Sequence, residues 1–163
     1  MQRDAASRRR RQHERGGSNL SCSIIMEVRM EQTEGLGRQA EVWVDGHLLC
    51  VCDGVSAPDA RAAPGVLEDV KFEYMGAEGF SWAEAVRGNP AKKRTLEPLG
   101  RWSYVGYGQV MSIMPVVIDF GLVVMEDANW TTDEKLVAKF VRIAIDRLEI
   151  TRATDPDWPE GMR

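Results

Sequence analysis

Histidine is scarce in this chain of 163 residues, which contains only His13 and His47. General acid–base catalysis near neutral pH draws on histidine more often than on any other side chain. Neither histidine is accompanied by a G-x-S-x-G elbow or another nucleophile motif. The shortage disfavours a Ser-His-Asp or Cys-His enzyme, and we expect a non-enzymatic protein that needs no cofactor.

Long apolar runs are also missing, and so is an even set of cysteines. The basic N-terminal residues are not followed by the apolar segment of a signal peptide, and no stretch approaches the length of a transmembrane helix. Cys22, Cys50 and Cys52 leave one thiol over in any disulfide scheme, and positions 50 and 52 of one strand bridge poorly. These features predict a protein of the reducing cytoplasm with no membrane contact.

The formal net charge of -4 is distributed unevenly along the chain. Residues 1–19 carry six arginines and two acidic residues, which is +4, so the remaining residues carry -8. An acidic body repels a phosphate backbone unless its cations gather on one face. The balance therefore disfavours a dedicated binder of duplex nucleic acid.

The chain divides by composition into three parts. Residues 1–19, with the run Arg8–Arg11, have almost nothing to bury, which predicts a disordered basic tail. That tail is merely solvated, is translated sequence upstream of a real start near Met26, or is a nucleic-acid-binding or targeting arm. Residues 20–153 are expected to form a single β-rich domain, and residues 154–163 a short mobile tail.

Apolar and polar residues alternate over 22–30 and over 66–74, which predicts half-buried strands. Between them, Asp45-Gly46 separates two apolar runs and predicts a type I′ hairpin over 40–52. A two-residue loop places Val44 opposite His47 and Trp43 opposite Leu48. Both hairpin faces are then mostly apolar, which favours burial on both sides.

Ser81 and Glu84 form a capping-box pattern ahead of Gly88, a residue free to adopt positive φ, so a short helix is expected at about 82–87. Residues 102–113 and 116–125 are predicted as two long strands. Gly106 and Gly108 in the first permit a sharp bend, a bulge or a close backbone approach. They match no phosphate-binding loop, because no helix follows them.

Residues 133–150 are compatible with two structures. Leu136, Phe140, Ala144 and Leu148 share one face of a helical wheel, which favours an amphipathic helix over 133–150 and an α+β fold. Residues 140–150 are, however, rich in β-branched side chains that alternate with others. We expect a short helix or turn near 133–138 followed by a closing strand, with the long helix as the alternative.

The pattern as a whole amounts to about six strands with one or two short helices. Regularly spaced short strands with glycine corners predict a mainly β fold. Its expected form is a small antiparallel barrel, closed or partly open, of the OB-like or a related type.

Two groups of residues suggest catalysis or metal binding. His47, Cys50 and Cys52 are zinc-ligand types, but His47 lies on the opposite strand face from the cysteines, so we expect no metal site. Asp119 and Asp146 interrupt apolar segments and form a conceivable catalytic pair. A structural hydrogen bond or contact with water explains each carboxylate more simply.

The remaining candidate site is a basic loop that leads into an aromatic-rich strand. Binders of single-stranded nucleic acid combine cations that neutralise phosphates with exposed rings that stack on bases. If the face that carries Trp102 and Tyr104 points inward, those rings belong to the core instead. The residues concerned are Lys92, Lys93, Arg94, Arg101, Trp102, Tyr104 and Tyr107.

The leading hypothesis is a non-enzymatic binding module for single-stranded nucleic acid or a protein partner, which it contacts through this loop and strand. The alternative is a structural or assembly domain that packs against another protein, with Trp43, Trp102 and Trp130 as anchors. An enzyme that uses carboxylates such as Asp119 comes third. The sequence leaves the oligomeric state open.

Overall fold

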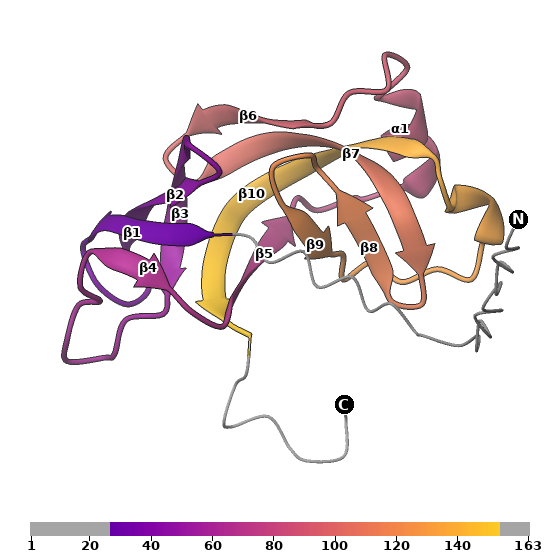
Figure 1. The fold of residues 1–163 in the computed structure, drawn as a ribbon. Helices are drawn as coiled ribbons and strands as arrows, with labels where there is room; N and C mark the ends of the chain where they lie inside the picture. The colour runs from indigo at the N-terminus through magenta and orange to yellow at the C-terminus, as the bar shows by residue number, and fades with distance from the viewer. Residues whose placement is uncertain (1–26, 154–163) are drawn as a thin grey trace, which may run out of the picture.

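The computed structural model describes residues 27–153, and the chain there is mainly β, as predicted (Figure 1). The predicted tails, residues 1–19 and 154–163, lie outside the described residues, and so does the 22–26 part of the first predicted strand. Among the described helices, none is long and apolar enough to cross a membrane. The elements are β1 (Val28–Thr33), β2 (Gln39–Val44), β3 (His47–Gly54), β4 (Gly65–Leu67), β5 (Val70–Gly76), α1 (Trp82–Arg87), β6 (Thr95–Gly100), β7 (Ser103–Ile113), β8 (Val116–Asp119), β9 (Val124–Glu126), the 3₁₀ turn η1 (Glu134–Leu136) and β10 (Phe140–Arg152).

These strands form one sheet, which strand pairing does not close into a barrel. Its order is β4-β1-β2-β3-β10-β7-β8-β9, while β5 pairs with β10 and β6 pairs with β7 outside this path. β3 and β10 run parallel, and the other pairs are antiparallel. Strand β5 meets the end of β9 through side chains: Tyr74 donates a hydrogen bond to Asp127 and packs edge-on against Phe120. The predicted closed barrel is therefore not what strand pairing produces.

Strand β10 organises the sheet because it pairs with three others. Residues 140–145 pair with β7, residues 145–152 pair with β5, and residues 149–151 also pair with β3. The 3₁₀ turn η1 precedes it, so the predicted turn and closing strand are confirmed and the alternative helix over 133–150 is wrong. The buried side chains of β10 are those of Val141, Ile143, Ile145, Leu148 and Ile150.

The hairpin of β2 and β3 has the predicted register, with Val44 opposite His47 and Trp43 opposite Leu48. The turn residues Asp45 and Gly46 have φ of 46° and 78°, as a type I′ turn requires. The expectation of burial on both sides is wrong, because Trp43 and Leu48 are 37% and 45% exposed. The outer face of the hairpin is open to solvent at these residues.

Two predicted strands are each divided in two. The segment 66–74 breaks at Asp69, where φ is 51°, into β4 and β5. The segment 116–125 reverses at Gly121, where φ is 85°, so that β8 pairs with β9. Strand β6 was not among the predicted elements, and these three differences account for the larger number of strands.

The helix α1 has the predicted range, and the Ser81 side chain accepts a hydrogen bond from the Glu84 amide. Gly88 does not use positive φ, since its φ is -77°. A Cβ at Gly88 would instead lie 2.7 Å from Cβ of Arg142 on β10. Glycine is therefore needed there for the close approach of α1 to β10.

Of the bend, bulge or close approach predicted for Gly106 and Gly108, the structure shows a close approach of β7 to neighbouring side chains. A Cβ on Gly106 would lie 2.6 Å from Cε1 of the fully buried Phe120, and one on Gly108 would lie 2.6 Å from Cγ2 of Ile118. The two glycines thus leave room on β7 for the ring that fills the space between β7, β8 and β5.

Replacing Gly106 by alanine should lower the free energy of unfolding by about 1–3 kcal/mol, because the added methyl group overpacks the core against Phe120. Urea unfolding of the variant measures the loss. Gly76→Ala is the matched control, since a Cβ there would meet nothing closer than 3.9 Å. Equal losses in the two variants would contradict this packing role.

Candidate functional site

Three cations of the predicted basic loop lie over two aromatic rings outside the core. The Nζ atom of Lys93 is 5.0 Å from the centroid of the Tyr107 ring. Lys92 Nζ and Arg94 Cζ are 5.9 and 5.7 Å from the centroid of Phe140. Arg142 is exposed and is the β10 residue paired with Tyr107. We call the following residues the basic–aromatic patch: Lys92, Lys93, Arg94, Tyr107, Phe140 and Arg142.

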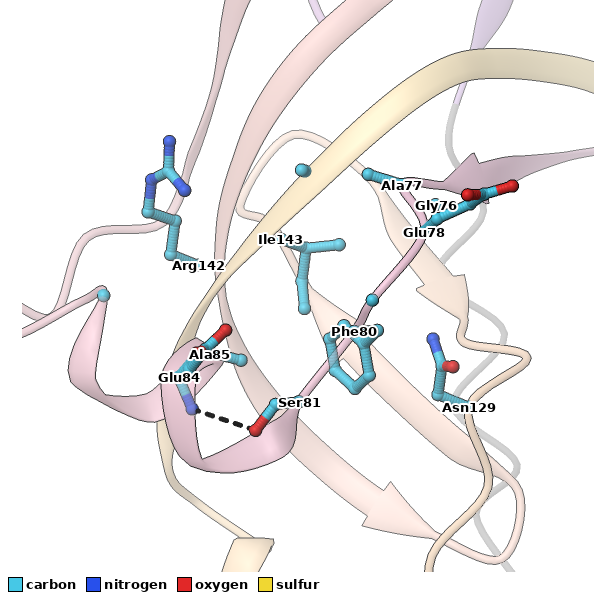
Figure 2. A pocket seen from close by; sticks show the side chains of 13 residues that line it. Gly76, Ala77, Glu78, Phe80, Ser81, Glu84, Ala85, Asn129, Arg142 and Ile143 are labelled. Carbon is cyan, nitrogen blue, oxygen red and sulfur yellow. Dashed lines mark hydrogen bonds between the residues drawn. The ribbon is translucent and has the colours of Figure 1, made fainter.

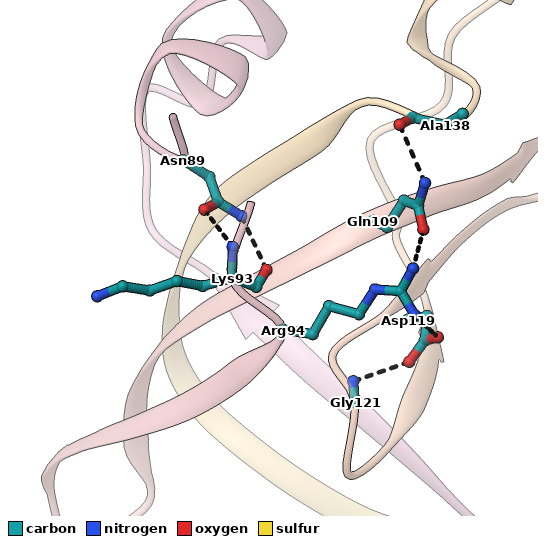
Figure 3. Close-up of polar contacts among 7 residues, drawn as sticks. All are labelled: Asn89, Lys93, Arg94, Gln109, Asp119, Gly121 and Ala138. Atoms are coloured by element: carbon teal, nitrogen blue, oxygen red, sulfur yellow. Dashed lines mark hydrogen bonds and ion pairs between the residues drawn. The ribbon is translucent and has the colours of Figure 1, made fainter. Parts of the chain in front are cut away.

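The loop is held against the sheet by the buried Asn89 (Figure 3). Its side-chain amide donates to the carbonyl oxygens of Lys93 at 3.0 Å and of Val141 at 3.2 Å. Its Oδ1 accepts from the Lys93 amide at 2.9 Å. Because Val141 belongs to β10, Asn89 fixes the loop relative to the strand that carries Phe140 and Arg142. Sequence reasoning missed Asn89, although its place between Gly88 and Pro90 marks a helix end.

Arg94 is fixed by side chains of β7 and β8. It donates to Gln109 and to Oδ2 of Asp119, the latter at 3.5 Å (Figure 3). Asp119 also accepts from the Gly121 amide at 2.8 Å. The Asp119 carboxylate therefore has the structural partners that the simpler interpretation predicts.

The conceivable carboxylate pair does not come together. Asp119 pairs with Gln109 on β7, whereas Asp146 accepts a hydrogen bond at its carbonyl from Ser103 at the other end of that strand. Ser103 and Gln109 are six positions apart, which is about 20 Å along an extended strand. The two carboxylates cannot share a substrate at that separation.

The patch keeps positive charge that its neighbours do not neutralise. Lys93 lies 3.6 Å from Glu97 and Arg94 lies 3.5 Å from Asp119, and the side chains of both pairs reach solvent. Exposed ion pairs of this kind contribute at most about 1 kcal/mol. Lys92 and Arg142 have no carboxylate within 4.0 Å in residues 27–153.

Three of the predicted site residues lie away from this patch. Arg101 and Trp102 form the turn between β6 and β7, where the Arg101 guanidinium is 3.9 Å from the centroid of the indole ring. Arg101 and Tyr107 are six positions apart, which is about 20 Å along a strand. The structure therefore divides the predicted site between the two ends of the paired part of β6 and β7.

Tyr104 belongs to the core rather than to a binding surface. It is 3% exposed, and its hydroxyl accepts from the Cys50 amide and donates to the Cys50 carbonyl, both at 2.9 Å. Pairing between β3 and β10 begins only at Cys52. The hydroxyl thus replaces the missing strand partner of Cys50, and the ring has no free face for a base.

The described thiols and the described imidazole are poor candidates for chemistry. Burial raises the pKa of Cys50, assisted by Glu41, and burial assisted by Glu149 raises the pKa of Cys52. Protonated thiols are weak nucleophiles. His47 is exposed, with Nδ1 3.1 Å from the Asp45 carbonyl oxygen. No three His, Cys, Asp or Glu side chains in the described part are placed to hold a metal ion, and Cys22 lies outside that part.

Asp53 is a buried carboxylate whose hydrogen-bonding capacity is well used. It accepts from the Thr33 hydroxyl, from Ser56 Oγ at 2.6 Å, and from the amides of Val55 and Ser56 at 2.8 Å each. Burial alone would raise the pKa of Asp53, but these hydrogen bonds together outweigh burial and hold the pKa below its usual value. The arrangement fixes the chain after β3 and leaves no free group for catalysis.

A small hollow lies between α1, β10 and the segment Gly76–Ser81 (Figure 2). Its volume is about 210 Å³, below the 300–1,000 Å³ that is usual for ligand pockets. Phe80 and Ile143 face into it, while the Arg142 guanidinium lies on the other side of β10. Ser81 Oγ accepts from the Glu84 amide as the cap of α1, and no hydrogen bond from it to a carboxylate is found in the described residues, so the hollow does not suggest a reaction.

Tyr104→Phe should lower the free energy of unfolding by about 1–3 kcal/mol, because the Cys50 amide and carbonyl lose their partner inside the protein. Urea unfolding measures the loss. Tyr107→Phe is the control, because no hydrogen bond of the Tyr107 hydroxyl is found in the described residues. The stability of this variant should therefore hardly differ from that of the wild type. A Tyr104→Phe variant with wild-type stability would mean that this hydroxyl does not support β3.

Acid should destabilise the fold through Asp53. Its pKa is lower in the folded than in the unfolded chain, so its stabilising effect is present above the unfolded value and is lost as the pH falls below about 4. Unfolding measured at a series of pH values should show a steeper loss below pH ~4 for the wild type than for Asp53→Asn. Parallel curves for the two proteins would contradict this role.

The chain matches no family model, no curated protein and no solved structure. The charges, rings and contacts of the chain itself therefore carry the functional inference.

Proposed function

We propose that this chain is a non-enzymatic cytoplasmic module that binds single-stranded nucleic acid through the basic–aromatic patch. The observation that supports this most directly is the placement of three loop cations over two rings on the neighbouring strands β7 and β10. Cations neutralise phosphates, and aromatic faces stack on bases of any sequence. We infer that the patch binds the strand with little sequence preference.

The energies of the contacts favour an exchange of partners on the rings. A cation over an exposed ring contributes about 0.5–1 kcal/mol. A base stacked on the same ring contributes about 1–3 kcal/mol. A base can therefore displace the flexible side chains of Lys92 and Lys93 from Phe140 and Tyr107. The displaced ammonium groups are then free to contact the phosphates on either side.

The charge of the rest of the chain favours a single strand over a duplex. Residues 20–163 carry a formal net charge of -8, which repels a long polyanion that lies across the whole surface. A flexible single strand can contact the patch and turn away from the acidic regions. An OB-like, partly open barrel that presents this strand surface is part of the same proposal.

Lys92→Gly tests the proposal without straining the fold. Lys92 has φ of 54°, a conformation that glycine adopts more easily, so the variant should be at least as stable as the wild type. It should bind a single-stranded oligonucleotide more weakly. The slope of log affinity against log salt should fall in magnitude by about 0.7 for the phosphate contact that is lost.

Arg101→Gly is the matched control, since it also removes one cation from a left-handed position, with φ of 44°, at the distant turn between β6 and β7. Its binding and salt slope should equal those of the wild type. Fluorescence anisotropy with labelled DNA and RNA strands measures both variants. Absent or salt-independent binding of the wild type would reject the proposal, and equal losses in both variants would reject the location.

A further inference from the structure

A row of outward side chains crosses four neighbouring strands at one end of the molecule, where β1, β2, β3 and β4 lie together (Figure 1). Pairing places Val66 of β4 beside Arg29 of β1, Arg29 beside Trp43 of β2, and Trp43 beside Leu48 of β3. Val66 is 57% exposed, and Trp43 and Leu48 are exposed as well. Large apolar side chains that line up on one sheet face mark a surface for contact with a protein.

This apolar row is accompanied by charges of both signs. Arg29 lies within it, while Glu31 accepts from Trp43 Nε1 at 2.8 Å and Glu41 accepts from Gln32 Nε2 at 2.6 Å. Across the described ranges, Arg29 has no carboxylate within 4.0 Å, and Glu31 and Glu41 have no cation within that distance. The surface therefore offers a cation and two carboxylates that lack ionic partners.

We propose that this face binds a second copy of the same chain, face to face about a two-fold axis. A two-fold interface uses one patch twice, so the patch must be complementary to itself. A patch with an apolar row and both charge signs meets that condition, because Arg29 of each copy can lie against Glu41 of the other. A partner with one dominant charge would leave either Arg29 or the glutamates unmatched.

The apolar row would then be buried between two packed sheets, which normally lie about 10 Å apart. The basic–aromatic patch is on β7 and β10 and does not take part, so this inference does not depend on the proposed function. A dimer would carry two such patches on one particle, which strengthens binding to a long strand by raising the effective concentration.

Sedimentation equilibrium of the full chain tests this directly, with a concentration-dependent monomer–dimer equilibrium as the expected result. Leu48→Lys and Val66→Lys should each shift it toward monomer, and both sites are exposed enough to accept lysine in the folded chain. Leu99→Lys is the control, since Leu99 is a more exposed apolar residue of β6 outside the row. A monomeric wild type at every concentration would overturn the proposal, and so would equal dissociation in all three variants.

An exchange of charges tests the axis. Arg29→Glu places glutamate against Glu41 in both halves of the interface, and Glu41→Arg places arginine against Arg29, so each variant alone should be monomeric. An equimolar mixture of the two should form a heterodimer, because both contacts then join opposite charges. A mixture that stays monomeric, or two variants that dimerise as well as the wild type, would show that Arg29 and Glu41 do not meet.

Discussion

The register shift near Asp146 is the constraint on which the sheet depends. Ahead of it the odd-numbered residues of β10 face the core, and after it Leu148 and Ile150 do so. Without the shift, Arg147 and Glu149 would point inward, where an ionised side chain is costly. With it, the two side chains lie on the opposite face of the strand, where they form an ion pair and are 36% and 23% exposed. Strand β10 can therefore bury apolar residues against β7 and against β5 in turn.

The start of β7 holds this shift in place. The Ser103 hydroxyl donates to the Asp146 carbonyl at 2.7 Å, and the Leu148 amide donates to the Trp102 carbonyl at 2.9 Å. The next residue, Tyr104, supplies the hydrogen bonds that β3 lacks there. The junction of β3, β7 and β10 thus explains why part of the predicted aromatic strand is structural.

The same shift explains what the sequence could and could not predict about the fold. The β2–β3 hairpin and α1 follow from turn and capping residues within each segment, so both were predictable. In β10 the apolar positions Val141, Ile145 and Leu148 are four and three residues apart, which is a helical spacing. A bulged strand and an amphipathic helix give the same pattern. Only pairing with β7 and β5 decides between them, and that pairing joins segments far apart in the chain.

The candidate site shows a similar division. The chain leaves the loop along β6 and returns along β7, so Thr95 pairs with Tyr107 while Arg101 lies at the distant turn. Arg101 is thus closer to the loop in sequence than Tyr107 is, but it is farther from the loop in space. Phe140 and Arg142 enter the site from β10, through pairing that no local pattern reveals.

The backbone conformation of Lys92 bears on whether its side chain contributes to the stability of the fold. A non-glycine residue in a left-handed conformation costs about 1 kcal/mol or more, and Lys92 and Arg101 both adopt it. For Arg101, close stacking on Trp102 offsets that cost. Lys92 has only a distant contact with Phe140, at 5.9 Å, and no described carboxylate. Since the fold gains so little from its ammonium group, Lys92 is the position at which the proposed binding role can be tested with little effect on folding.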